Sequence, residues 1–227
     1  MKHRLLLFCG ILAPVIYVGT VIVGGAIRPG YSHIAQAVSE LIESGAPNKP
    51  VLDALFIVYN LLASAFGLGM FAVIRARGGN KGKTSGSWGA LLLVAIGVLG
   101  LAMTLFFPMD PRNAQTTLAG TMHLVLAGII SLGTMLTILL IGLWLRNDPR
   151  LGKYWTYSLI TDIVVLVSGG LAAASAASAS RYMGLLERVT IGAFLQWVLV
   201  MALLPHPALS QAEGADDGDV DAVGDHL

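Results

Sequence analysis

Six apolar segments, each about as long as a membrane is thick, dominate this sequence. They cover residues 5–27, 51–74, 88–107, 117–145, 154–179 and 184–205. A bilayer core of about 30 Å requires about 20 helical residues at 1.5 Å per residue. The segments do not alternate apolar and polar residues as the strands of a membrane β-barrel would. The sequence therefore predicts an all-α integral membrane bundle of six transmembrane helices.

The composition excludes a water-soluble globule. Residues of the AVILMFWYC set make up 56% of the chain and charged residues 12%, against about 25% charged in soluble domains. A soluble protein of this size cannot bury so much apolar surface. The single cysteine, Cys9, lies inside the first span, which excludes a disulfide framework and a redox dithiol. Phosphate-binding glycine loops, His-Glu-x-x-His and Gly-x-Ser-x-Gly are absent, and we expect no cofactor.

Lys and Arg residues are distributed unevenly between the two sets of connecting segments. With the N-terminus inside, nine of the 14 lie on the inner side and five on the outer side, as the positive-inside rule requires. Trp88, Trp144 and Trp155 then fall at inner helix ends, where aromatic belts form. We therefore expect both termini in the cytoplasm and a multi-pass protein of the plasma membrane, surrounded by membrane lipids. The basic inner side suits anionic lipid and gives no reason to expect nucleic acid as a partner.

The chain divides into a transmembrane domain, residues 1–205, and an acidic tail, residues 206–227. The tail holds six of the 13 acidic residues and no Lys or Arg. Such a composition cannot bury enough apolar surface to fold. We expect this tail to be disordered and to act as a solubilising segment.

The segment between the first two spans predicts a short amphipathic helix on the outer side. Ser32 suits its N-cap, while Gly45 and Pro47 suit its end. One face would hold the apolar residues Ile34, Val38, Leu41 and Ile42, and the other would hold His33, Gln36, Glu40 and Glu43. We expect such a helix to lie flat on the outer leaflet.

Polar residues inside the spans recur at intervals of about four and predict stripes that face one another in the bundle. The three stripes are Asp53, Asn60, Ser64 and Gly67; His123, Ala127, Ser131 and Thr134; and Arg188, Gly192 and Gln196, with Glu187 beside them. Such stripes are typical of packing seams between helices or of a buried polar site. Asp162 stands apart, about 10 Å beyond Trp155 by helical rise. It must be protonated, paired with a basic group or in contact with water.

Several short motifs follow one another in a fixed order. They are residues 8–14, Arg-Pro-Gly-Tyr-Ser-His at 28–33, Ser-Glu-Leu at 39–41 with Gly-Ala-Pro-Asn at 45–48, Phe-Pro-Met-Asp at 107–110, and Gly-Leu-Leu-Glu-Arg at 184–188. Over about residues 5–205 the chain thereby resembles the prokaryotic membrane family known as domain of unknown function 998. The resemblance implies a multi-helix membrane protein and no specific activity. It draws attention to Tyr31, Ser32, Ser39, Glu40, Pro47, Asp110, His123, Glu187 and Arg188.

The polar residues expected at the outer end favour a binding or structural role. We expect a polar pocket at the outer leaflet that takes a lipid headgroup or a small polar ligand. Its candidate residues are Tyr31, Ser32, His33, Glu40, Asp110, His123, Glu187 and Arg188. The glycine-rich helix faces permit a homo-oligomer without requiring one.

Two other classes of function stay open. The first is a membrane-embedded lipid hydrolase with His123 or His33 as base, Asp110 or Glu40 to orient it, and Ser39 as a candidate nucleophile. Its metal-dependent form would use His33, His123 and Asp110 as ligands, although their spacing matches no metal motif. The second is a proton-coupled transporter with Asp53 and Asp162 as relay carboxylates; an inverted repeat is not visible in the sequence.

Overall fold

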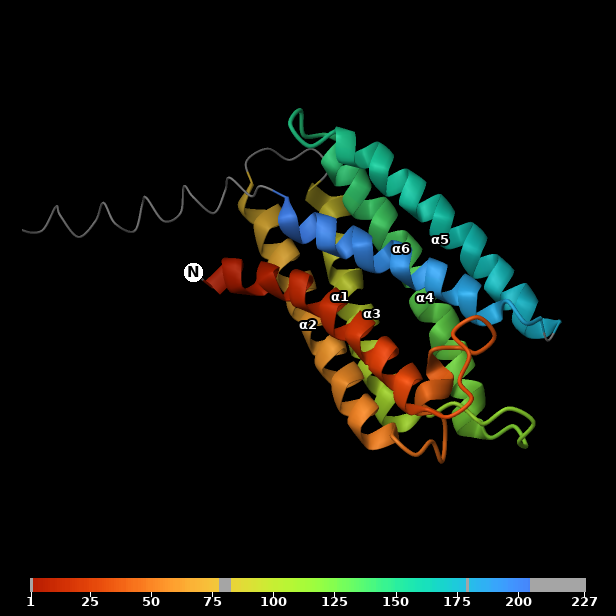
Figure 1. The fold of residues 1–227 in the computed structure, drawn as a ribbon. Helices are drawn as coiled ribbons and strands as arrows, with labels where there is room; N and C mark the ends of the chain where they lie inside the picture. Colours follow the sequence, from red (N-terminus) through yellow and green to blue (C-terminus); the bar gives the residue numbers. More distant parts are fainter. Residues whose placement is uncertain (1, 78–82, 179, 205–227) are drawn as a thin grey trace, which may run out of the picture.

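The computed structural model describes residues 2–77, 83–178 and 180–204, which form six long α-helices and no strand (Figure 1). The helices are α1 (Lys2–Ile27), α2 (Lys49–Ala76), α3 (Lys83–Phe106), α4 (Leu118–Arg146), α5 (Lys153–Ala177) and α6 (Met183–Leu203). All six are long and apolar enough to cross a membrane. The predicted all-α bundle of six transmembrane helices is confirmed. The expectation of a disordered tail at 206–227 falls outside the described residues.

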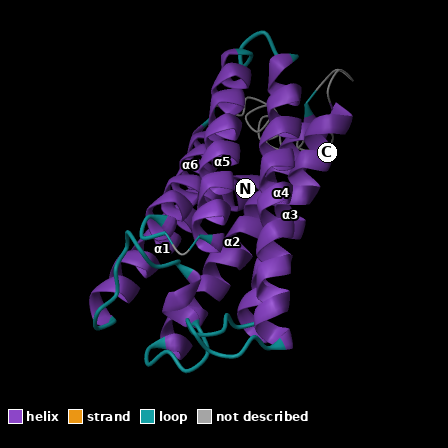
Figure 2. Cartoon of the chain, turned by 90° about the vertical axis from the view of Figure 1, so that its right-hand side faces the viewer, coloured by secondary structure: helices purple, strands orange, loops and turns teal. Residues whose placement is uncertain are grey.

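The helices pack in the order of the sequence. Each contacts the next along the chain, and α6 returns to contact α1, so the six form a closed ring. The segments 28–48 and 107–117 therefore lie together at one end of the bundle, and the α4–α5 connection lies at the other (Figure 2). The end of the bundle that carries these two segments is called the loop end. The opposite end, where α2, α4 and α6 end, is called the basic end.

Large apolar side chains fill the bundle toward the basic end. Trp197 of α6 is fully buried, and its indole Nε1 donates to Ser158 Oγ of α5 at 3.0 Å. On α3, a Cβ at Gly86 would lie 2.8 Å from Trp144, and a Cβ at Gly89 would lie 2.8 Å from the side chain of Ile141. Glycine at these two positions allows α3 and α4 to approach closely, as small residues do between membrane helices.

The stripe on α2 does not face those of α4 and α6 as predicted, because its residues from Asn60 to Gly67 pack against α3. Ser64 Oγ donates to the Asn60 carbonyl at 2.9 Å. A Cβ at Gly97 of α3 would overlap Ser64 Oγ, and a Cβ at Gly100 would overlap the Asn60 amide. The polar residues of α2 thus lie where the two backbones come closest.

The predicted stripes on α4 and α6 do not stay in the interior. His123 and Thr134 are buried, but Ser131 of α4 is exposed, and so are Gly192 and Gln196 of α6. Four residues turn an α-helix by 400°, so each step of four rotates the stripe by about 40°. Two steps carry the side chain from the inside of the ring toward its outer surface.

The segment 28–48 differs from the predicted amphipathic helix. It contains turns and one short 3-10 helix, η1 (Ser39–Ile42), which is followed by a left-handed backbone at Gly45, with φ of 82°. Its apolar residues form a small core with α1 and α2, namely Val38, Leu41, Ile42, Leu52, Phe56 and Val21. Glu40 and Glu43 are buried as well, whereas Ile34 is 52% exposed. The segment therefore packs against the helix ends through both apolar and charged side chains.

Candidate functional site

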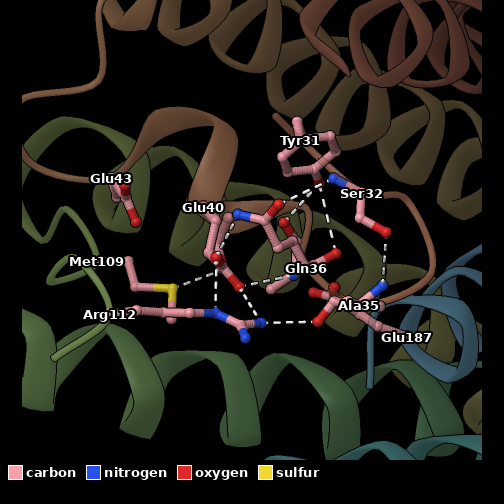
Figure 3. Close-up of polar contacts among 12 residues, drawn as sticks. Tyr31, Ser32, Ala35, Gln36, Glu40, Glu43, Met109, Arg112 and Glu187 are labelled. Carbon is pink, nitrogen blue, oxygen red and sulfur yellow. Dashed lines mark hydrogen bonds and ion pairs between the residues drawn. The ribbon is translucent and has the colours of Figure 1, made fainter. Parts of the chain in front are cut away.

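Glu40 is the centre of a polar network at the loop end (Figure 3). Its carboxylate is 2% exposed and accepts hydrogen bonds from Ala37 N at 2.9 Å and from Gln36 Nε2 at 3.0 Å. Arg112 donates to both oxygens, from Nε at 2.9 Å and from Nη2 at 2.8 Å. Burial alone would raise the pKa of Glu40, but the hydrogen bonds from Arg112, Gln36 and Ala37 together lower it. The carboxylate is therefore held ionised inside the protein.

Arg112 reaches this carboxylate from the 107–117 segment. Its side chain is 52% exposed, and Nη2 also donates to the Ala35 carbonyl at 2.7 Å. Hydrogen bonding to Glu40 raises the pKa of Arg112 further above its usual value. The pair thus joins one buried charge to one partly solvated charge across two segments far apart in the sequence.

Further contacts fasten the same two segments together. Ser44 N donates to the Met109 carbonyl at 2.9 Å, and Ser39 Oγ donates to Met109 Sδ at 3.0 Å. Arg28, at the end of α1, donates to the Glu43 carboxylate and to the Glu40 carbonyl. The other Glu43 oxygen, Oε2, is buried and has no hydrogen-bond partner in the described part of the chain.

Arg188 of α6 fastens the 28–48 segment from the other side. Its Nη1 donates to the carbonyls of Gln36 and Gly184, both at 2.8 Å, and its Nη2 donates to the Tyr31 hydroxyl at 2.5 Å. Arg188 Nε is buried and finds no acceptor among the described residues. A Cβ at Gly184 would overlap the backbone of Gln36, so this close approach requires glycine.

Glu187 contributes a second contact between α6 and the same segment. Its Oε2 accepts a hydrogen bond from Val38 N at 2.8 Å. Leu185 N donates to the Ile34 carbonyl at 2.9 Å. The first turn of α6, whose backbone N–H groups lack partners within the helix, thus uses one of these groups to hold the segment.

Tyr31 and Ser32 complete the network. The Tyr31 hydroxyl donates to the Ala37 carbonyl at 2.6 Å while it accepts from Arg188. Burial raises the pKa of Tyr31 to about 12, although Arg188 acts in the opposite direction. Ser32 Oγ accepts from Ala35 N at 3.3 Å, which closes a turn inside the segment.

His33 lies next to Tyr31, with ring centroids 5.2 Å apart, and against Gly25 of α1. Partial burial lowers the pKa of His33, and the charge of Arg188 lowers it further. The imidazole is therefore neutral near pH 7 and serves as a packing contact with α1.

Asp110 and His123 make separate local contacts. Asp110 accepts hydrogen bonds from Thr117 N and Thr117 Oγ1, both at 2.8 Å, and Thr117 caps the start of α4. His123 Nδ1 lies 2.8 Å from the Phe107 carbonyl. Because a carbonyl oxygen only accepts, Nδ1 carries the proton and Nε2 keeps its lone pair.

The structure gathers part of the predicted site and separates the rest. Tyr31, Ser32, Glu40, Glu187 and Arg188 belong to one network through Gln36 and its neighbours. Direct hydrogen bonds between Ser39, Asp110 and His123 are not found in the described part of the chain. Groups of three or more His, Cys, Asp or Glu able to hold a metal are likewise not found among the described residues, so His33, His123 and Asp110 do not gather into such a group.

The two carboxylates considered for a proton relay lie toward opposite ends of the bundle. Asp53, in the second turn of α2, forms an ion pair with Lys49 at 2.7 Å, and its Oδ1 is buried without a partner among the described residues. Asp162 lies in α5 nearer the basic end, where its Oδ1 is also buried and without a described partner. A chain of hydrogen bonds between the two carboxylates is not found in the described residues.

Arg28, Gln36 and Arg112 were not assigned a role in the site from the sequence. Each serves as the partner of a predicted residue, and its role depends on contacts between separate segments. The charge balance of the sequence could have indicated these partners. The outer segments hold about as many basic as acidic residues, so each buried carboxylate had a potential counterion.

Comparison with known proteins supplies the family. The family model described as "Protein of unknown function (DUF998)" matches residues 11–204. No curated protein and no solved structure matches the chain. The match includes nearly all of the helical bundle and the segments at both of its ends. The chain belongs to the DUF998 family of proteins of unknown function.

Proposed function

We propose that this protein is a binding protein of the plasma membrane whose loop end faces away from the cytoplasm. In this proposal the ligand is a lipid headgroup or a small polar molecule. It binds under the 28–48 segment, beside the first turns of α6. Arg188 and Glu187 contact it from α6, and Tyr31 contacts it from the segment itself.

The observation that carries the proposal is a set of buried polar atoms without partners at the loop end. Among the described residues these are Arg188 Nε, Glu43 Oε2 and Asp53 Oδ1. Leaving such an atom unsatisfied costs about 1–3 kcal/mol, and native proteins rarely retain that cost without a reason. A ligand that carries both donors and acceptors would lower this cost by pairing with them.

The charge distribution supports the proposed orientation. Among the described residues, Arg75, Arg146, Arg150 and Lys153 are exposed at the basic end, whereas most charges of the loop end are paired. Basic residues of short loops remain on the cytoplasmic side of a membrane.

Native mass spectrometry of the detergent-purified protein tests the proposal. We expect a retained small-molecule or lipid mass in the wild type and its loss in Arg188→Gln. Arg150→Gln is the matched control, because it removes a guanidinium from the basic end. Tyr31→Phe is a milder second variant that keeps the fold and weakens retention several-fold. A mass that survives in both loop-end variants, or its absence from the wild type, would refute the site.

One observation favours a hydrolase as the second candidate. The hydrogen bond to the Phe107 carbonyl leaves the Nε2 lone pair of buried His123 available as a base. We expect His123→Gln to abolish hydrolysis of any lipid ester that the purified wild type cleaves. Hydrolysis at the wild-type rate in this variant would exclude the role.

A further inference from the structure

The basic end presents a surface of exposed cations. Arg75 of α2, Arg146 of α4 and Lys153 of α5 are exposed there, as is Arg150 in the α4–α5 connection. The Arg75 and Arg146 guanidinium groups each lie 5.9 Å from an aromatic ring centroid, which fixes them against the helices.

Little negative charge offsets these cations within the described part of the chain. Asp148 in the α4–α5 connection is the acidic residue there, and it already pairs at 2.6 Å with Arg77, which directly follows α2. That ion pair also joins the end of α2 to the connection, which brings their cations to the same part of the bundle. This surface, which we call the basic surface, consists of Arg75, Arg146, Arg150 and Lys153.

The chain leaves the bundle at the same end. α6 ends at Leu203, and Leu204 is buried in the core cluster that also contains Leu151 of the α4–α5 connection. Residues 205–227 follow, with six acidic residues and no Lys or Arg. The first of these acids, Glu213, comes nine residues after Leu204. Nine extended residues span about 30 Å, and a helix with its side chains is about 10 Å wide, so the acids can reach the whole basic surface.

We propose that the acidic segment 205–227 docks on the basic surface of its own chain. A single exposed ion pair is weak, but a tethered segment has a high effective concentration at its site, and six acids meet four exposed cations. The docked segment then competes with anionic lipid headgroups, which seek the same cations. Membranes rich in anionic lipid release it, and neutral membranes keep it docked.

The sole cysteine makes a direct test simple. In a Cys9→Ser background, a spin label at Ala222→Cys reports the mobility of the segment in neutral detergent. We expect a label that is immobilised at 20 mM salt and released at 1 M salt, because surface charges are screened beyond about 3 Å at that concentration. Changing all six acids to their amides should release the label at low salt. A label at Asn113→Cys, at the loop end, should respond to neither change.

Three further measurements identify the occupant of the basic surface. The double variant Arg146→Gln/Arg150→Gln should release the label while the fold remains intact. Nanodiscs of phosphatidylglycerol should release it, and nanodiscs of phosphatidylcholine should not. Mobility should not depend on protein concentration; a dependence would mean that the segment docks on a second copy and would overturn the proposal. A label equally mobile at low salt in the wild type and in the amide variant would also overturn it.

Discussion

The two ends of the bundle use charge in opposite ways. At the loop end, Glu40 is 2% exposed and joined to Arg112, and Glu43 is joined to Arg28. At the basic end, Arg146, Arg150 and Lys153 are exposed, and apolar side chains such as Trp197 fill the interior beneath them.

This difference separates two ways of stabilising a membrane bundle. The basic end depends mainly on close packing of large side chains. The loop end depends on buried hydrogen bonds between segments distant in the sequence. Such a network stabilises the fold less when one of its partners is removed. Removing one partner at the loop end should therefore have consequences for several others.

The largest effect should come from the apolar core. Trp197→Ala removes a fully buried side chain and leaves Ser158 Oγ without its donor. We expect the free energy of unfolding, measured in mixed detergent micelles, to fall by about 3–5 kcal/mol. Trp88→Ala is the control, because that side chain is 60% exposed, and it should change the free energy by less than about 1 kcal/mol. Similar losses in both variants would contradict the packed core.

Gly184→Ala should produce the next largest effect, at the loop end. The new Cβ would overlap the backbone of Gln36, so the 28–48 segment must move away from α6 and lose its hydrogen bonds there. We expect a loss of about 2–3 kcal/mol, as in other overpacked sites. Gly170→Ala in α5 is the matched control, since nothing lies within 4 Å of its new methyl group. It should be neutral or stabilising by up to about 1 kcal/mol.

Arg112→Ala tests the main ion pair. Glu40 would keep its bonds from Ala37 and Gln36 but lose both bonds from the guanidinium. Hydrogen bonds to charged groups contribute about 1.5–3 kcal/mol, and the half-exposed guanidinium places the expected loss at the lower end, about 1.5 kcal/mol. Arg181→Ala removes an exposed arginine that bonds Tyr182, and its effect should stay within about 0.5 kcal/mol. Equal effects would show that the pair does not hold the segment.

The pH dependence should be the smallest of these effects. The pKa of Glu40 is lower in the folded protein than the ordinary value of about 4.5 for a glutamate, because Arg112, Gln36 and Ala37 donate to the carboxylate. Its contribution to stability is therefore complete above about pH 4.5 and is lost as the pH falls through the folded pKa. Thermal unfolding between pH 7 and pH 3 should show this loss in the wild type. In Glu40→Gln the acidic loss should be smaller; an unchanged profile would mean that Glu40 titrates as in the unfolded chain.

The sequence was enough to predict the helices because each span satisfies a local requirement of length and hydropathy. The bounds of α2 and α4 differ from the prediction by at most two residues at either end, since charged, Pro or capping residues mark them. Local spacing also predicted that Asn60 and Ser64 share one face of α2, but it assigned that face to the stripes of α4 and α6, whereas the structure packs it against α3.

The 28–48 segment could not be predicted in the same way. Periodicity assigned Glu40 and Glu43 to a solvated face, because a lone carboxylate is costly to bury. Their burial depends on Arg28 and Arg112, and the latter lies 72 residues from Glu40 in the sequence. The positions of Gly192 and Gln196 likewise depended on which face of α6 meets its neighbours, which spacing alone does not specify.

The 28–48 segment is a fixed cap held over the loop end by buried charge. Hydrogen–deuterium exchange of the purified protein tests this claim most directly. Ala37 N and Val38 N donate to the carboxylates of Glu40 and Glu187, so a peptide that covers residues 35–42 should exchange slowly in the wild type and much faster in Arg112→Ala. Exchange in the wild type as fast as in the exposed residues 113–116 would contradict the account.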